Sequence, residues 1–119
     1  MKRGGYTRMV QALFLCLLCC LPKTVLSQRQ TYVDSLLADI ARTKSDTEKV
    51  KSLIRLAVAY RPNFVTSEFY YANKALRLSE NVDWDTGKMY ADEILGECYN
   101  RLMAYNDAIV HFKRSIAIT

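Results

Sequence analysis

The residues best suited to chemistry in this chain lie in the stretch between Glu93 and His111. Glu93 and Glu97 are four positions apart, so a helix would place both carboxylates on one face. Two carboxylates placed in this way could act as a general acid and a general base. No glycine-rich phosphate loop and no serine elbow accompanies them in the sequence. We therefore expect a solvated acidic patch at these two residues and no enzymatic activity.

Histidine and cysteine are too scarce to build a metal centre. The chain has one histidine and four cysteines, and only Cys98 lies beyond residue 27, the others being Cys16, Cys19 and Cys20. A structural zinc site takes four such ligands, so His111 and Cys98 do not suffice. His111 also lacks the acidic neighbour that follows the phospho-accepting histidine of sensor kinases. We expect a solvated helix histidine, a partly buried cysteine, no metal and no cofactor.

The N-terminal segment has the composition of an export signal. Three basic residues precede an almost wholly apolar run over residues 9–21, and Pro22 follows it. This run is shorter than the ~20 residues that a membrane-spanning helix requires. We predict a cleaved signal peptide over residues 1–27, with cleavage between Ser27 and Gln28. A retained anchor and a lipoprotein signal are the alternatives, although the cysteines of the run lack the small preceding residues of a lipoprotein.

Removal of this leader changes the charge of the chain. The full chain carries 17 basic and 12 acidic residues, a net charge of +5. Four of the basic residues lie in the leader, which leaves 13 against 12 and a net charge of +1. The excess charge therefore belongs to the export signal, and we expect no nucleic acid partner. Membrane association would come only through that signal or through an anchor encoded further along the gene.

Helical periodicity predicts an all-α fold for the rest of the chain. Apolar residues at helical spacing indicate a first helix over residues 31–42 and a second that ends before Pro62. Ser45 and Glu48 have the spacing of a capping box at the start of this second helix. A third helix begins near residues 63–66 and runs to about residue 80. We assign residues 28–45 to an N-terminal capping helix with its linker, and residues 46–119 to the following helix pairs.

The second half of the chain continues this pattern. Residues 81–87 are expected to form a loop anchored by Trp84, after which Asp85 or Thr86 caps a fourth helix. Asn106 is the expected N-cap of a fifth helix. Its first turn would carry a hydrophobic staple between Tyr105 and Val110. The residues that we expect to face inward from this last helix are Ile109, Phe112 and Ile116.

The stretch LGECYNRLMAYNDAIVHF, over residues 95–112, resembles the tetratricopeptide repeat. Gly96 and Ala108 are small and would allow two helices to approach closely, while the surrounding Leu95, Tyr99, Tyr105 and Phe112 fill the space around that contact. This repeat is a helix–turn–helix unit that stacks into an α-solenoid and binds other proteins. The resemblance therefore implies a solenoid of antiparallel helix pairs.

An earlier copy of the same unit precedes this stretch. Its packing residues are Leu56, Ala57, Tyr60 and Ala75, and the first three lie 39 positions before their counterparts Leu95, Gly96 and Tyr99. This interval exceeds the ~34 residues of the commonest tetratricopeptide spacing, which implies an extended connection. Glu68 and Ser115 depart from the pattern, because alanine-like residues are expected there. Two repeats fall below the usual minimum of about three, so we expect a longer protein or a module that needs a partner or self-association.

The resemblance also implies which residues line a binding groove. In such solenoids the first helix of each pair lines the concave side. The groove positions are Lys51, Ile54, Arg55 and Val58 in the first copy, and Tyr90, Glu93, Glu97 and Arg101 in the second. The groove would be basic at one end and acidic at the other, and ordinary solvated helix faces are the alternative interpretation. The expected occupant is a protein or a peptide.

The signal peptide, the long connection and the first helix together are similar to one subfamily. It comprises the periplasmic input regions of tetratricopeptide sensor proteins from Bacteroidetes-type bacteria, which continue into a transmembrane helix and a histidine kinase or a transcriptional regulator. We therefore expect an exported, periplasmic input or scaffold region that is cut short at its C-terminus. A free-standing exported adaptor is the second hypothesis.

Overall fold

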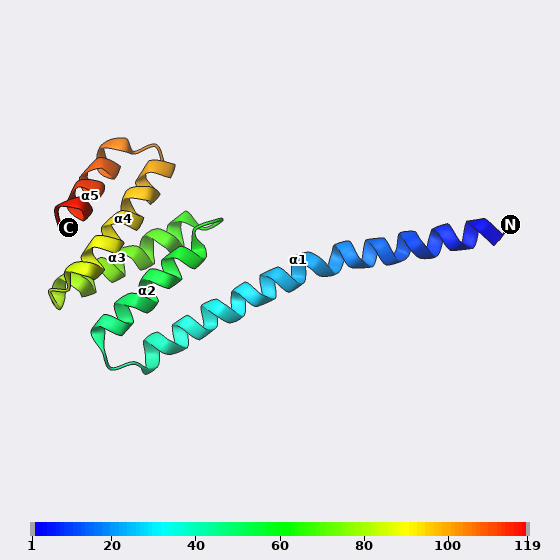
Figure 1. Cartoon of the computed structure of the whole chain (residues 1–119), viewed down its shortest axis with the longest axis horizontal. Coiled ribbons are helices and arrows are strands. Elements are labelled where there is room, and N and C mark those ends of the chain that lie inside the picture. The colour runs from blue at the N-terminus through cyan, green and yellow to red at the C-terminus, as the bar shows by residue number, and fades with distance from the viewer. Residues whose placement is uncertain (1, 119) are drawn as a thin grey trace. The chain divides into compact units, whose positions relative to one another are not determined.

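The computed structural model describes the backbone of residues 2–118 and the side chains of residues 7–17 and 26–118. Within these ranges the chain is helical and contains no strand, which confirms the all-α prediction (Figure 1). The helices are α1 (Lys2–Arg42), α2 (Asp46–Tyr60), α3 (Val65–Asn81), α4 (Asp85–Arg101) and α5 (Tyr105–Ile118).

The chain divides into two compact units, Met1–Tyr32 and Val33–Thr119. The first unit is the N-terminal part of α1, in which the side chains of Met9, Leu13 and Phe14 are each more than 60% exposed. The Thr31 hydroxyl donates to the Ser27 carbonyl at 2.8 Å, so the helix has no break at the predicted cleavage site. Among the described residues, no helix combines the length and the apolar character needed to cross a membrane. Cleavage after Ser27 stays a prediction.

The second unit begins with the last turns of α1, which pack against α2. Val33 and Leu36 are buried in a cluster with Leu56, and Tyr60 and Tyr71 border this cluster. These two α1 residues are three apart and therefore share one face of the helix. The predicted end of the first helix at residue 42 is confirmed, whereas its predicted start lies inside the longer α1.

The capping box at the start of α2 is only half formed. The Glu48 backbone N–H donates to Ser45 Oγ at 3.4 Å, as expected of an N-cap serine. The reciprocal bond is absent from this turn, because the Ser45 N–H donates to Thr43 Oγ1 and the Glu48 carboxylate pairs with Lys51 at 2.7 Å. Ser45 therefore caps the helix as expected, whereas the Glu48 carboxylate pairs with Lys51 and does not bond the Ser45 N–H.

The predicted loop over residues 81–87 is too long. Asp85 is already the first residue of α4, and Trp84 is its N-cap without a side-chain hydrogen bond, so neither Asp85 nor Thr86 caps the helix. Asp83 adopts a left-handed conformation with φ of 51° and makes the turn in fewer residues than expected. Gly87 lies inside α4 and is buried there. A Cβ at Gly87 would lie 2.6 Å from the Trp84 ring and 3.0 Å from Val50 Cγ1, so only glycine fits.

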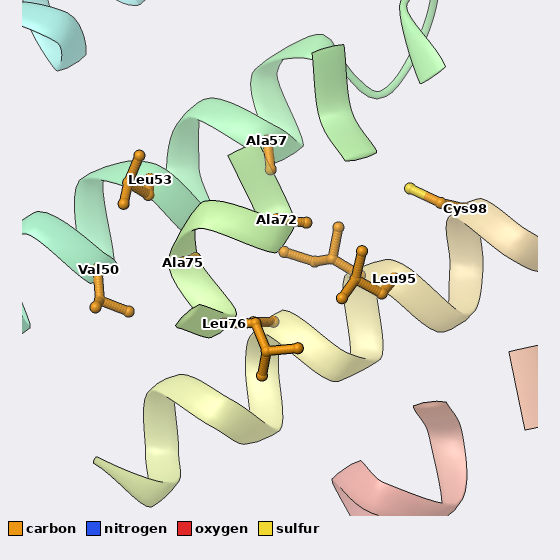
Figure 2. Close-up of a cluster of buried hydrophobic side chains, with 10 residues drawn as sticks. Val50, Leu53, Ala57, Ala72, Ala75, Leu76, Leu95 and Cys98 are labelled. Carbon is orange, nitrogen blue, oxygen red and sulfur yellow. The ribbon is translucent and has the colours of Figure 1, made fainter. Parts of the chain in front are cut away.

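Helices α2, α3 and α4 enclose the main core of the second unit (Figure 2). Consecutive helices run in opposite directions in the ribbon, which gives the antiparallel pairs α2–α3 and α4–α5 (Figure 1). Ala57, Ala72 and Ala75 are fully buried where α2 and α3 meet. Leu76 and Leu95 fill the space between α3 and α4. Small residues at the crossing let the helix backbones approach closely.

The last helix packs on α4 through a face that differs from the expected one. Ala108 and Ser115 are buried, and the Phe112 ring lies over Gly96, where an added Cβ would stand 2.7 Å from it. Ile109 and Ile116 are 49% and 71% exposed, so the prediction that they face inward is wrong. The reason is geometric: a helix in contact through residues 108, 112 and 115 turns positions 109 and 116 toward its outer side.

The start of α5 also differs from the prediction. The helix begins at Tyr105, so Asn106 is a helical residue and not the N-cap. Tyr105 and Val110 are 57% and 54% exposed, which excludes a buried staple between them. Met103 instead makes the turn before α5 with a positive φ of 60°. The chain therefore reverses one or two residues earlier than its cap signals indicate.

Candidate functional site

A hollow of about 250 Å³ lies between α2 and α4 in the second unit. It is lined from α2 by Lys51, Ile54 and Arg55, and from the start of α4 by Trp84, Thr86 and Tyr90. Four of the eight groove residues predicted from the sequence are therefore brought together here. The surface of the hollow is mainly apolar, and basic side chains lie at its edge.

The helical spacing of these residues explains why they converge. Residues 51, 54 and 55 share one face of α2, and residues 86 and 90 share one face of α4. Gly87 allows the first turn of α4 to approach Val50 of α2, since a side chain there would collide with it. Trp84 lies against the same glycine. The contribution of Gly87 was not predicted, although a glycine at the start of a helical pattern is the signal for such a close approach.

The two cations of the hollow differ in their partners. Lys51 Nζ lies 2.7 Å from Glu48 Oε1 on the same helix. The Arg55 guanidinium is exposed, and within the described part of the chain it has no hydrogen bond or ion pair. Tyr90 is also 48% exposed. The hollow therefore presents an aromatic ring and a free cation to an incoming group.

The other predicted groove residues lie outside this hollow. Val58 and Glu93 are exposed on α2 and α4. Glu97 Oε2 pairs with an Arg61 guanidinium nitrogen at 2.8 Å, and Arg101 pairs with the carboxylate of Glu68. The charges of these last two residues are therefore engaged within the protein. The acidic end of the groove therefore offers less free negative charge than the sequence suggests, because Glu97 is already paired.

Glu68 is the centre of a buried charge cluster that sequence analysis did not identify. Its side chain is fully buried, and its carboxylate lies between the guanidinium groups of Arg61, at 3.1 Å, and Arg101. A buried carboxylate requires such partners, because loss of hydration is otherwise uncompensated. The departure of Glu68 from the alanine-like pattern was the available signal. Its arginine partner on α4 could not be found without the fold, since it lies 33 positions away.

Cys98 lies beside this cluster and is fully buried. Burial, followed by the nearby negative charge of Glu68, raises the pKa of the Cys98 thiol to about 12. An Arg101 guanidinium N–H approaches the sulfur at 3.6 Å. Because the thiolate is the nucleophilic form, this cysteine is inert at neutral pH. The sequence analysis predicted a small, partly buried side chain, and the structure buries it completely.

His111 is not the solvated histidine that the sequence suggested. Its Nδ1 lies 2.8 Å from Asp92 Oδ1, and only 17% of its side chain is exposed. The ring stacks on Tyr99 with centroids 5.3 Å apart. Asp92 is 1% exposed and also has an Arg114 nitrogen at 3.6 Å. His111 is paired because the buried Asp92 faces α5 from α4 and requires a polar partner there.

No cluster suited to a metal ion emerges from this geometry. In the part of the chain that the structure describes, no group of three or more histidine, cysteine, aspartate or glutamate side chains could hold one. The Asp92–His111 pair and the Glu68 cluster are both joined to basic side chains inside the protein. These buried polar groups therefore connect the helices, whereas the hollow between α2 and α4 is open to a partner.

The described part of the chain defines an all-α protein built from antiparallel helix pairs. Comparison of the chain with models of protein families, with curated proteins and with solved structures found no match. The function therefore has to be argued from the residues and their geometry.

Proposed function

We propose that this chain is an exported protein–protein interaction module, in which the hollow between α2 and α4 binds a side chain of a protein or peptide partner. The observation that carries the proposal is the combination of Ile54, Trp84 and Tyr90 with the free Arg55 cation in one hollow. Tyrosine, tryptophan and arginine are the residues most often found at the energetic centres of protein interfaces. A partner would insert an apolar side chain and place a carboxylate or carbonyl oxygen near Arg55.

The helix pairs support a tetratricopeptide-like arrangement as part of this proposal. Each pair carries a buried small residue in its first helix, Ala57 in α2 and Gly96 in α4. In each pair a tyrosine three positions later stacks on a ring of the second helix. Such a stack of helix pairs would leave the first helices available to line a common groove.

We propose a place in signal transduction for this module, as the periplasmic input or scaffold region of a membrane-bound histidine kinase or transcriptional regulator. A free-standing exported adaptor is the second candidate, and the same hollow supports it. The two differ in what the gene encodes after codon 119. An in-frame continuation with further repeats and an apolar span of about 20 residues supports the sensor, and a stop codon there overturns it.

Export itself has a direct test. Expression of the full chain in a Gram-negative host, followed by N-terminal sequencing of the periplasmic fraction, is expected to give a product that begins at Gln28. A Ser27→Arg substitution should block cleavage, because the processing site requires small residues. Recovery of the uncleaved chain from the cytoplasm alone would contradict the proposal.

Peptide selection tests the hollow. We expect displayed peptides selected on the full chain to bind at least about tenfold more weakly to R55A/Y90A, since both side chains line the hollow. Both residues are exposed, so the variant should keep its fold. The matched control is Y105A/K113A, which removes an exposed tyrosine and an exposed cation from α5. Peptides that bind all three proteins equally would refute the assignment of this hollow.

A further inference from the structure

A second surface, formed by α3 together with residues of α1 and α2, has chemistry of its own. Two hollows of about 480 Å³ and 370 Å³ lie next to one another there. Lys74 and Arg77 line both of them and therefore form their common border. Neither residue belongs to the predicted groove. The surface that comprises these two hollows and their border is called the α3 surface below.

The floors of the two hollows are apolar. The larger contains the rings of Phe69 and Tyr70, and the smaller contains Ile40, Leu53 and Leu78. Recesses of this kind accept side chains of another protein, whereas a flat lipid surface does not enter them.

The charge of the α3 surface has one sign. Lys49, Lys74 and Arg77 contribute three cations, and no carboxylate lines either hollow. Lys74 Nζ lies 5.3 Å from the centre of the Tyr70 ring, a cation–π contact that leaves its charge uncompensated. Lys49 has only a distant partner, Asp46, at 3.9 Å. Since the chain beyond residue 27 has a net charge near zero, this is a local concentration of positive charge.

From the two apolar hollows and the three cations beside them, we infer that the α3 surface binds an acidic protein segment that carries two apolar side chains. The apolar side chains, at positions i and i+4, would enter the two hollows, and the carboxylate at position i+2 would point the same way and lie over the border that Lys74 and Arg77 form. A helix is about 10–12 Å wide with its side chains. Two side chains at positions i and i+4 of an extended segment point the same way and lie ~13 Å apart, which suffices to cross α3.

A synthetic probe with this pattern tests the inference. The probe is the fluorescein-labelled peptide Glu-Phe-Glu-Glu-Glu-Leu-Glu, titrated with the full chain while fluorescence anisotropy is recorded. We expect saturable binding, and binding at least about tenfold weaker when serine replaces both phenylalanine and leucine in the probe. Equal binding of the serine peptide would overturn the inference, because attraction by charge alone would then explain the result.

Charge reversal locates the site on the protein. K74E/R77E should weaken binding of the probe by more than about tenfold, because like charges then face each other. K44E/K113E is the matched control, since it reverses two exposed lysines that line neither hollow. It should change the affinity by less than about threefold. Equal losses in both variants, or no saturable binding to the original chain, would overturn the inference, and circular dichroism checks that each variant is folded.

Two further measurements separate this surface from other occupants and from the proposed groove. Vesicles of phosphatidylglycerol and phosphatidylcholine that bind the chain through Lys74 and Arg77, when the peptide does not bind, would overturn the inference in favour of a lipid surface. R55A/Y90A should bind the probe as the original chain does. A loss in R55A/Y90A equal to that in K74E/R77E would place the acidic segment in the groove and not on α3.

Discussion

The two helix pairs of the second unit share one plan and differ at a few internal positions. In both, a tyrosine near the end of the first helix stacks on a ring of the second, Tyr60 on Tyr71 and Tyr99 on His111. The second helix of the first pair carries buried Glu68, where the last helix carries buried Ala108. A small residue needs no partner, but a buried carboxylate needs cations from neighbouring segments. The buried charge of Glu68 therefore adds to the apolar packing of the first pair on α4. Close packing at Gly96 adds to the contact of Asp92 with His111 between α4 and α5.

Removal of one of the two arginine partners of Glu68 should have the largest effect on the free energy of unfolding. Arg101→Ala leaves the buried carboxylate with Arg61 as its remaining guanidinium partner, and we expect a loss of about 2–3 kcal/mol in the free energy of unfolding. Urea denaturation followed by circular dichroism measures it. E68A/R101A, which gives the first pair the alanine of the second, should recover most of the loss. An unchanged unfolding midpoint in R101A alone would show that the charge cluster does not join the pairs.

A larger side chain at Gly96, where the Phe112 ring lies close to α4, should have the next largest effect on stability. Gly96→Val places carbon atoms where the Phe112 ring lies, and overpacking of this kind costs about 1–3 kcal/mol. Asn100→Val, at an exposed position of the same helix, controls for the helix propensity of valine. Thermal unfolding compares the two. Equal stability of G96V and N100V would contradict the role of Gly96 in the contact between α4 and α5.

The Asp92–His111 pair provides a third difference between the helix pairs. His111→Phe keeps a ring for Tyr99 but removes the partner of Asp92 Oδ1, and we expect a loss of about 1–3 kcal/mol. The first pair has Leu53 at the place that corresponds to Asp92. D92L/H111F should therefore be more stable than H111F in urea denaturation. A double variant no more stable than H111F would indicate that Asp92 is satisfied by Arg114 alone.

The smallest expected effect concerns pH and Cys98. The folded pKa is raised from the ordinary 9.0 to about 12, so the folded state holds the proton that the unfolded chain releases. Stability from this source is complete below about pH 8.5 and falls as pH rises toward 12. Cys98→Ala places in α4 the alanine that α2 has at the corresponding position, Ala59. Between pH 8.5 and 10 its free energy of unfolding should fall by about 1 kcal/mol less than that of the original chain. Identical pH dependence of the two proteins would contradict the raised pKa.

Local signals in the sequence predicted the helices well. Ser45 does cap α2, the chain does turn at Pro62, and the ends of α1, α2 and α3 fall close to the expected residues. These features depend on neighbours within a few positions, which a sequence displays directly. Gly96 also lies where α4 meets α5, under the Phe112 ring, and Ala108 is buried on α5.

The predicted caps at Asp85 or Thr86 and at Asn106 are wrong although such signals are local. Most of the other missed features depend on residues far apart in the chain. The last helix has two apolar stripes, and only its contact with α4 decides that Ala108 and Ser115 face inward and Ile109 and Ile116 outward. The partner of His111 lies 19 positions away on another helix. The engagement of Glu97 and Arg101 by the charge cluster likewise required the fold. Half of the predicted groove therefore converges, and half of it lies elsewhere.

The Glu68 cluster also constrains how this protein can change over evolutionary time. Loss of either arginine leaves a buried charge short of a partner, and loss of Glu68 brings two cations together without their shared anion. Each single step therefore passes through a less stable protein, whereas coordinated changes do not. Among descendants of this chain, positions 61, 68 and 101 are expected to vary together, and the exposed residues around the hollows are free to vary one at a time.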